Sequence, residues 1–396
     1  MRLLFVILLL LLTACGSTGK KVYPKLDPVT SSIKVAPLWV AKVGEKLTRQ
    51  HRQLSVAVTE DRVYAASAKG KLIALKQNGG EILWTRPMVT DVSCGPKVDG
   101  DVLYVGTGDA HLTALDANSG DILWRIELSS EVLANPAVND DKVFVHTIDG
   151  KLTAYNKTNG EKVWVDSHDV PALTLRGTSS PVVVGDRVIS GYANGKLVAL
   201  DVETGRPLWE SVVAVPSGRT DLQRMVDIDG LLQVDGDEIY AVTYQGRLAA
   251  ISVENGRSVW TRDMSSFTGV AMDKKQLYLT DADGHVWAVD RRTGATLWRQ
   301  DTLEGRDVTG PVVLGNTVVV ADGAGLLHWL STEDGAFVAR HNLAKIYDWA
   351  FVDWGDENRS EYDFGVTSTL EVANDRLYVR NNMGALSVFA LPASMN

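Results

Sequence analysis

The sequence predicts an all-β protein, an eight-bladed β-propeller built from four-stranded blades. One phrase, seen clearly at residues 70–84, recurs seven times, and its last copy is degenerate. Each copy joins an alternating strand to a Gly-containing tight turn and then to a short strand that ends in Trp. The Trp residues are 45, 40, 40, 45, 51 and 38 residues apart, a period typical of one propeller blade. These residues are Trp39, Trp84, Trp124, Trp164, Trp209, Trp260 and Trp298.

Four strands can be assigned within each period from alternation and turn residues. In the third repeat, Asn139 to Asp141 and Asn159-Gly160 form the turns that separate them. The predicted strands are residues 137–138, 142–146, 151–155 and 162–165. A glycine recurs at the second turn of each repeat, where a hairpin needs a positive φ, so we interpret these glycines as structural.

The two ends of the chain are out of phase with the repeat. Residues 37–40 form a Trp strand with no preceding partners, whereas residues 366–372, 376–380 and 385–390 form three strands with no Trp strand after them. Pairing the N-terminal strand with these three gives an eighth blade and leaves no open edge. Residues 37–396 are therefore expected to form one closed propeller.

The repeated Trp residues are expected to wedge against neighbouring blades, with each indole N–H bonded locally. Ala339 stands where the seventh copy should have Trp, which predicts a weaker seam before the long segment 342–365. That segment is rich in aromatic and acidic residues, and we favour a packing role for it.

The N-terminus carries targeting information. Residues 3–12 are an apolar run that is too short to span a bilayer but suits a signal peptide. The sequence Leu12-Thr13-Ala14-Cys15 resembles a bacterial lipobox, which implies removal of residues 1–14, lipid attachment to Cys15 and, with Gly16 next, delivery to the outer membrane. Residues 15–36 are polar and are expected to form a flexible tether with a reach of up to about 70 Å.

Composition excludes several classes of function. With 40 basic and 49 acidic residues the net charge is −9, which disfavours nucleic-acid binding. Once Cys15 is lipidated, Cys94 is the single remaining thiol. We expect Cys94 to be buried in the first strand of blade two, where it acts as a small apolar residue. The seven His residues lack zinc-ligand spacing, so we expect no metal site.

The phrase from Ala114 to Trp124 resembles the tryptophan-docking repeat of quinoprotein dehydrogenases, which bind pyrroloquinoline quinone and calcium. The adjacent cysteines and the haem-attachment motif of those enzymes are absent from the sequence, and the chain is shorter. Asp116, Asp201 and Asp290 recur at one repeat position, which hairpin-turn hydrogen bonds explain. We therefore expect no catalytic residues and no cofactor. A quinoprotein-like oxidoreductase is kept as one alternative, and a glycan-binding propeller is kept as another.

Two neighbouring links between blades are unusually long, at residues 166–177 and 215–229. Such links emerge on one face of a propeller, so their residues can form one patch. The first link carries Leu173, Leu175 and Arg176, and the second carries Asp227 and Asp229. Apolar anchors beside an Arg and a carboxylate pair are typical of a protein-binding hot spot. Alternatively, the leucines begin the next inner strand and are buried, and Arg176 forms a salt bridge with one of the carboxylates.

The Leu-Thr-Leu-Arg-Gly sequence at 173–177 and the Asp-x-Asp of the second link, in an eight-bladed lipoprotein with this repeat, resemble the BamB family. The resemblance spans essentially the whole chain, although segment 342–365 is longer than usual. It implies a scaffold subunit of the outer-membrane β-barrel assembly machine (the BAM complex) that supports the folding and insertion of outer-membrane proteins. The implied partners are the POTRA domains of BamA, bound through Leu173, Leu175, Arg176, Asp227 and Asp229, and unfolded outer-membrane proteins are a further candidate. The implied location is the periplasmic face of the outer membrane, with the lipid on Cys15 as anchor.

Overall fold

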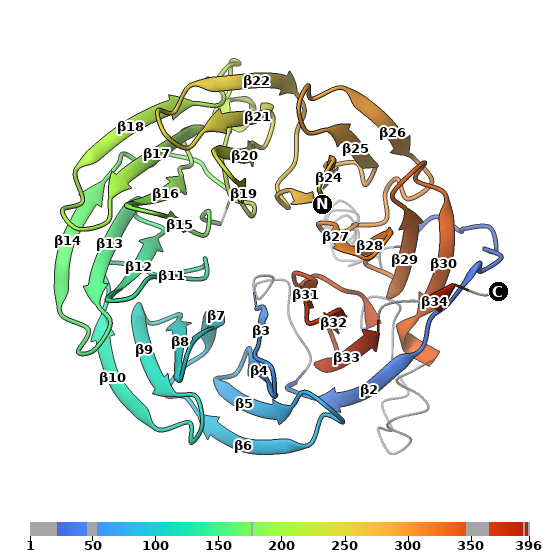
Figure 1. Cartoon of the computed structure of the whole chain (residues 1–396), viewed down its shortest axis with the longest axis horizontal. Helices are drawn as coiled ribbons and strands as arrows, with labels where there is room; N and C mark the ends of the chain where they lie inside the picture. The colour runs from blue at the N-terminus through green and yellow to red at the C-terminus, as the bar shows by residue number, and fades with distance from the viewer. Residues whose placement is uncertain (1–21, 46–53, 176, 346–363, 391–392, 395–396) are drawn as a thin grey trace, which may run out of the picture.

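Eight antiparallel four-stranded sheets are arranged as blades around one central axis (Figure 1). The computed structural model describes residues 22–45, 54–175, 177–345, 364–390 and 393–394. The predicted signal peptide (1–14), Cys15, Arg176 and most of segment 342–365 lie outside these residues. Among the described residues, no helix has the length and hydrophobicity needed to cross a bilayer.

Blades one to four follow one another along the chain, each with its strands in sequence order from the centre outward. Blade one contains β3 (Val56–Val58), β4 (Arg62–Ser67), β5 (Lys71–Lys76) and β6 (Ile82–Pro87). Blade two contains β7 (Val92–Asp99), β8 (Val102–Thr107), β9 (His111–Asp116) and β10 (Ile122–Glu127). Blade three contains β11 (Ala137–Val138), β12 (Lys142–Thr147), β13 (Lys151–Asn156) and β14 (Lys162–Ser167). Blade four contains β15 (Val182–Val184), β16 (Arg187–Gly191), β17 (Lys196–Asp201) and β18 (Pro207–Val212).

Blades five to seven repeat the pattern. A short 3-10 helix, η1 (Leu222–Arg224), lies in the link that leads into blade five. Blade five contains β19 (Gln233–Asp235), β20 (Glu238–Val242), β21 (Arg247–Ser252) and β22 (Ser258–Asp263). Blade six contains β23 (Ala271–Met272), β24 (Gln276–Thr280), β25 (Val286–Asp290) and β26 (Thr296–Gln300). Blade seven contains β27 (Val312–Leu314), β28 (Thr317–Ala321), β29 (Leu326–Ser331) and β30 (Phe337–Asn342).

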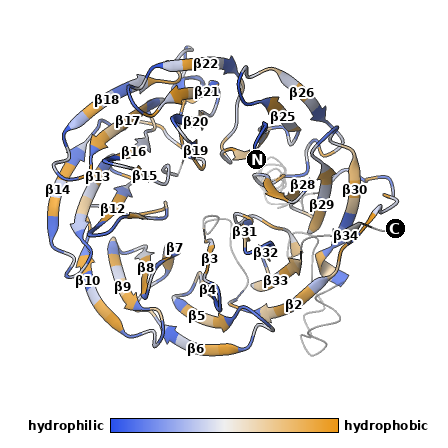
Figure 2. Ribbon diagram, viewed as in Figure 1, coloured by the Kyte–Doolittle hydropathy of each residue, from blue (hydrophilic) through white to orange (hydrophobic). Residues whose placement is uncertain are grey.

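Blade eight joins the two ends of the chain, which confirms the predicted closure. It contains β31 (Glu371–Ala373), β32 (Arg376–Arg380), β33 (Ala385–Ala390) and, as its outer strand, β2 (Pro37–Lys42). Trp39 pairs with Val388 across the junction. A further two-stranded sheet pairs β1 (Ile33–Lys34) with β34 (Ala393–Ser394). Hydrophobic residues follow the strands of each blade and polar residues gather at many of the turns (Figure 2).

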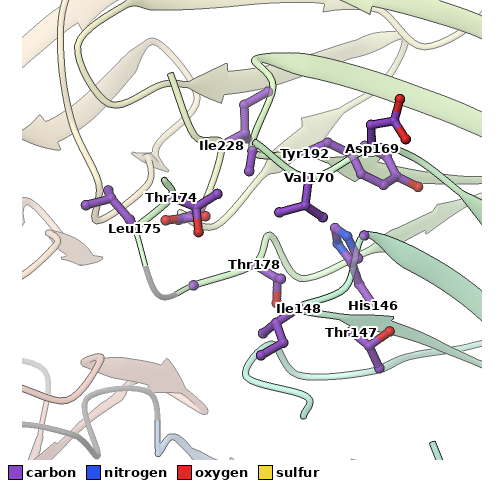
Figure 3. A pocket seen from close by; sticks show the side chains of 15 residues that line it. His146, Thr147, Ile148, Asp169, Val170, Thr174, Leu175, Thr178, Tyr192 and Ile228 are labelled. Carbon is purple, nitrogen blue, oxygen red and sulfur yellow. The ribbon is translucent and has the colours of Figure 1, made fainter. Parts of the chain in front are cut away.

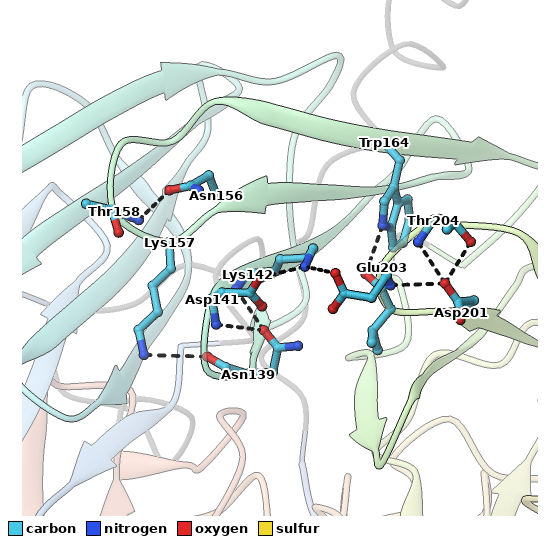
Figure 4. Close-up of polar contacts among 11 residues, drawn as sticks. Asn139, Asp141, Lys142, Asn156, Lys157, Thr158, Trp164, Asp201, Glu203 and Thr204 are labelled. Atoms are coloured by element: carbon cyan, nitrogen blue, oxygen red, sulfur yellow. Dashed lines mark hydrogen bonds and ion pairs between the residues drawn. The ribbon is translucent and has the colours of Figure 1, made fainter.

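The repeated Trp residues connect neighbouring blades, as predicted. The Nε1 atom of Trp164 in blade three donates to the Val202 carbonyl of blade four at 3.0 Å (Figure 4). The other six repeated indoles make the same contact with the next blade, at 2.8–3.1 Å. Each ring also covers the turn glycine of that blade. At Gly120, whose φ is +75°, a β-carbon would lie 2.8 Å from the ring of Trp84.

The turn aspartates act as predicted. Asp201 Oδ1 accepts from the backbone N–H of Thr204 at 2.8 Å, and Asp116 and Asp290 hold the equivalent turns of blades two and six. Cys94 also lies where the sequence predicted, in β7, and is fully buried. Burial raises the pKa of its thiol to about 12.

The seam between blades seven and eight differs from the weaker seam that Ala339 predicted. In blades one to six an Ala of the third strand pairs with the repeated Trp, as Ala154 pairs with Trp164. Blade seven inverts this pair, because Trp329 of the third strand lies opposite Ala339. The Trp329 ring is fully buried and meets Phe389 of blade eight edge-on, with the ring centroids 5.7 Å apart. An indole therefore lies at this seam too, but it belongs to β29 and not to the outer strand β30.

The predicted flexible tether at 15–36 is wrong for the described residues 22–36. Tyr23 is only 5% exposed, the backbone N–H of Ser32 donates to the Val338 carbonyl at 2.8 Å, and β1 is part of a sheet. These residues are bound along blades six and seven. Their polar composition concealed this arrangement, because much of the binding uses backbone carbonyl groups.

Candidate functional site

The candidate site lies where the links after blades three and four meet. In blades one to seven the strands run antiparallel in sequence order. The links between blades and the turns between second and third strands therefore share one face, here called the link face. The 168–181 link follows β14 and the 213–232 link follows β18, so both long links lie on the link face.

The structure brings together three of the five predicted site residues, Leu175, Asp227 and Asp229, and Leu173 lies two residues before Leu175 on the first link. The backbone N–H of Leu175 donates a hydrogen bond to Oδ2 of Asp227. Gly177 lies against Asp229, so closely that a β-carbon on the glycine would be 2.9 Å from Asp229 Oδ2. The fifth residue, Arg176, lies between these two contacts in sequence but outside the described residues.

The second link holds its two carboxylates by burying the residues around them. Met225, Val226 and Ile228 are all buried, and the backbone N–H of Ile228 bonds to the Tyr192 carbonyl at 3.3 Å. The Asp227 carbonyl accepts from the N–H of Tyr244 at 2.9 Å. Both neighbouring blades thus fix the backbone from which the carboxylates project.

The described residues compensate the charge of the two carboxylates poorly. Asp227 is 1% exposed, and its Oδ1 atom has no hydrogen-bond partner among the described residues. Burial raises the pKa of Asp227 to about 6, against the opposing effect of the Leu175 N–H. Burial and then the charge of Asp227 raise the pKa of Asp229 well above its usual range. A pair of this kind favours the approach of a cationic group.

The leucines are not part of the next inner strand, which begins only at Val182. Leu173 is 43% exposed and Leu175 is half-buried. The alternative in which both are buried strand residues is therefore wrong. The predicted Arg176 salt bridge lies outside the described residues.

A cavity of about 160 Å³ lies beneath this loop (Figure 3). Leu175, Ile228 and Asp229 line it on the loop side, and His146 and Tyr192 line it on the blade side. The Tyr192 ring lies between two imidazoles, with centroids 4.7 Å from His146 and 4.2 Å from His168.

Sequence reasoning missed His146, His168 and Tyr192. Burial lowers the pKa of His146 to about 4, so the ring is neutral at pH 7, and its Nδ1 is 2.9 Å from the Ser190 hydroxyl. His168 Nε2 is 2.8 Å from Asp166 Oδ2. The histidines were tested only for metal-ligand spacing, and Tyr192 belongs to no recurring motif.

One group of described residues has the atom spacing of a metal site, namely Asp281, Asp283 and His285. The Asp281 carboxylate already accepts from His285 Nδ1 at 2.8 Å and from Trp287 Nε1 at 2.9 Å. Its other oxygen accepts from the backbone N–H groups of Asp283 and His285. We interpret the group as a hydrogen-bonded turn.

Comparison with known proteins places this chain among outer-membrane assembly factors. The family model described as outer membrane protein assembly factor BamB matches residues 36–96, 74–300 and 282–391. A BamB from Alkalilimnicola ehrlichii is 50% identical over 84% of this chain and 86% of its own length. A BamB from Pseudomonas aeruginosa is 46% identical over 85% of this chain and 89% of its own length.

Solved structures give the same picture at the level of the fold. BamB from Moraxella catarrhalis superposes with a TM-score of 0.79 at 28% identity, covering 90% of this chain and all of that one. A quinohemoprotein alcohol dehydrogenase from Comamonas testosteroni gives a TM-score of 0.66 at 12% identity, over 93% of this chain and 78% of that one. At that identity the second likeness concerns the propeller alone.

Proposed function

Because the chain belongs to the BamB family of outer membrane protein assembly factors, we propose that it is a scaffold subunit that binds the POTRA domains of BamA. The binding surface consists of Leu173, Leu175 and Arg176 from one link and of Asp227 and Asp229 from the next. Through this contact the propeller supports the folding and insertion of outer-membrane barrel proteins within the BAM complex.

The observation that carries the proposal is the bond between the Leu175 N–H and the Asp227 carboxylate. It fixes the two links to each other, so that an exposed apolar anchor and a carboxylate pair form one surface. Exposed Leu173 supplies apolar area, and the carboxylates supply a negative charge that a cationic partner would stabilise. A preorganised apolar anchor beside a charge pair is the usual composition of a hot spot.

The protein acts without a catalytic step in this proposal. The sequence lacks the adjacent cysteines and the haem-attachment motif of quinoproteins. Asp229, whose pKa is raised well above its usual range, borders a cavity of about 160 Å³, which is smaller than a typical site for a drug-sized ligand. The relatives are also named as assembly factors.

The propeller is held at the periplasmic face of the outer membrane through a lipid on Cys15. The lipobox-like Leu12 to Cys15 and the name of the family support this location. Mass spectrometry of the membrane-extracted chain tests it, because lipidation predicts an N-terminal peptide that begins at Cys15 and carries diacylglycerol.

The binding test titrates purified POTRA domains with the unlipidated chain. Leu173→Ala and Asp229→Asn are expected to raise the Kd about tenfold or more, since truncating a hot-spot residue costs more than about 1.4 kcal/mol. Leu297→Ala is the matched control, because Leu297 is 49% exposed on the outer strand of blade six. An unchanged Kd for both site variants would overturn the site. Arg176→Glu tests the fifth residue in the same way.

A further inference from the structure

We propose that the link face of blades six and seven is a docking site for the chain's own residues 23–27, and that this docking turns the link face toward the membrane. The inference rests on the proposed lipid anchor and on the proposed partner surface. It adds a specific orientation, because the segment that leads to Cys15 leaves the propeller from a fixed place.

The docking site is built on a buried cluster of charged groups in blade seven and the link before it. Asp322 and His328 are fully buried, and Arg306 is 4% exposed. Asp322 Oδ2 lies 2.7 Å from Arg306 Nε and 3.0 Å from His328 Nε2. Arg340 Nε donates to His328 Nδ1 at 3.2 Å. The carboxylate and the imidazole thus fix the directions of the two guanidinium groups.

Both guanidinium groups bind the backbone of the N-terminal segment. Arg306 donates to the carbonyl oxygen of Pro24, and Arg340 Nη1 donates to the carbonyl oxygen of Asp27 at 2.6 Å. Charge-assisted bonds of this kind are stronger than those between neutral groups. The preorganised arginines therefore bind two backbone carbonyl groups that are three residues apart.

Tyr23 fixes the register of the segment. Its ring is 5% exposed and lies 5.7 Å from the Arg306 guanidinium, as a cation–π contact. Its hydroxyl donates to Asp307 Oδ2 at 3.3 Å. The ring covers Gly323 so closely that a β-carbon there would be 2.2 Å from the hydroxyl oxygen. Leu26 packs against the apolar core of blades six and seven.

The docked segment and the partner surface share the link face. Arg306 belongs to the link after β26, and Gly323 belongs to the turn between β28 and β29. Their backbones meet in a bond from the Gly323 N–H to the Arg306 carbonyl at 2.9 Å. Blade seven lies across the ring from blade three, and blade five separates blade six from blade four (Figure 1). The docked N-terminal segment and the proposed partner therefore contact the link face at different blades.

Docking shortens the free chain between lipid and propeller. Residues 15–23 reach at most about 30 Å when fully extended, compared with about 70 Å for residues 15–36. A tether of the shorter length, leaving from the link face, holds that face toward the bilayer. A partner that projects from the membrane would then meet the surface already oriented.

The experiment couples the chain that begins at Cys15 to vesicles of phosphatidylcholine with a maleimide lipid. Cys94 does not compete, because it is fully buried. A fluorescent non-canonical residue is placed at Ser217 on the link face or at Asn255 in the turn between β21 and β22 on the opposite face. Energy transfer to an acceptor lipid is expected to be at least twofold more efficient from Ser217.

The variant Tyr23→Ala removes the docking contact from the segment and leaves the Arg306–Asp322 pair intact. It is expected to equalise transfer from the two positions and to remove the hydrogen-exchange protection of residues 23–34. Arg292→Met, at an exposed turn arginine, is the control and should change neither. Equal transfer in the parent chain, or unprotected amides at 23–34, would overturn the proposal.

The result of the orientation experiment can be distinguished from the result of the POTRA-binding test. The lipid is attached chemically, so the result does not depend on natural lipidation. Tyr23→Ala should bind soluble POTRA domains with unchanged Kd, whereas Leu173→Ala should weaken binding without altering orientation. Loss of both properties in Tyr23→Ala would show a general folding defect and would overturn the docking role.

Discussion

The buried carboxylate of Asp227 destabilises the isolated propeller when it is charged. Its side chain is 1% exposed, one oxygen lacks a partner among the described residues, and burial raises its pKa to about 6. The protonated form is therefore favoured in the folded state relative to the unfolded chain, where the pKa of Asp is about 3.9. Stability from this group is full below about pH 4 and declines as the pH rises through 6.

Asp227→Asn should relieve this cost while keeping the acceptor for the Leu175 N–H. At about 1.4 kcal/mol per pKa unit, we expect the variant to be roughly 2–3 kcal/mol more stable than the parent at pH 8 and equal to it near pH 4. Urea unfolding at both pH values measures the difference. A gain of equal size at both pH values would contradict the electrostatic explanation. The same variant should bind POTRA domains more weakly, because it removes a negative charge from the surface.

At the scale of the element, the turn between the third and fourth strands joins each blade to the preceding one. Gly120 has a positive φ and also lies under Trp84, whereas Gly100 has a positive φ with open space around it. Gly100→Ala should cost about 1–2 kcal/mol from the left-handed conformation alone. Gly120→Ala should cost about 1–3 kcal/mol more, because the new methyl group displaces the indole.

Chemical denaturation of the two glycine variants measures the contact between blades separately from backbone strain. Equal losses of unfolding free energy would show that the turn, and not the indole, determines the need for glycine. Near-ultraviolet circular dichroism should report a changed Trp environment in Gly120→Ala only.

Sequence reasoning was most accurate for those elements that repeat. The four strands of blade three were predicted within two residues, because alternation and turn residues recur in every copy. The indole of Trp329 at the Ala339 seam was not foreseen, because it lies on the other strand of the pair. Two long links and their charges also sufficed to bring Leu175, Asp227 and Asp229 together.

Other features could not be found from the sequence. The contact between Tyr23 and Asp307 joins residues 284 positions apart, and it occurs once. No periodic pattern records such a contact. The arrangement of Tyr192 between two imidazoles is likewise a product of blade packing, since its partners come from β12 and from the start of the link after β14.

At the scale of the whole molecule, the ring depends on the strand that closes blade eight. Deleting residues 385–396 removes β33, the partner of β2, and should abolish the folded state because two sheet edges and the core of the junction are exposed. Deleting residues 391–396 removes only β34 and should leave the propeller folded. Circular dichroism and gel filtration distinguish the two outcomes, and a compact monomer from the longer deletion would contradict the dependence on closure.

The junction also sets an order of events during synthesis. Trp39 leaves the ribosome about 350 residues before its partner Val388. At about 5–20 residues per second, β2 waits roughly 20–70 s for β33. During that interval the nascent chain carries an unpaired strand at its leading end and an incomplete blade at its trailing end. Protection of the leading strand by a chaperone is thus most valuable before the final dozen residues appear.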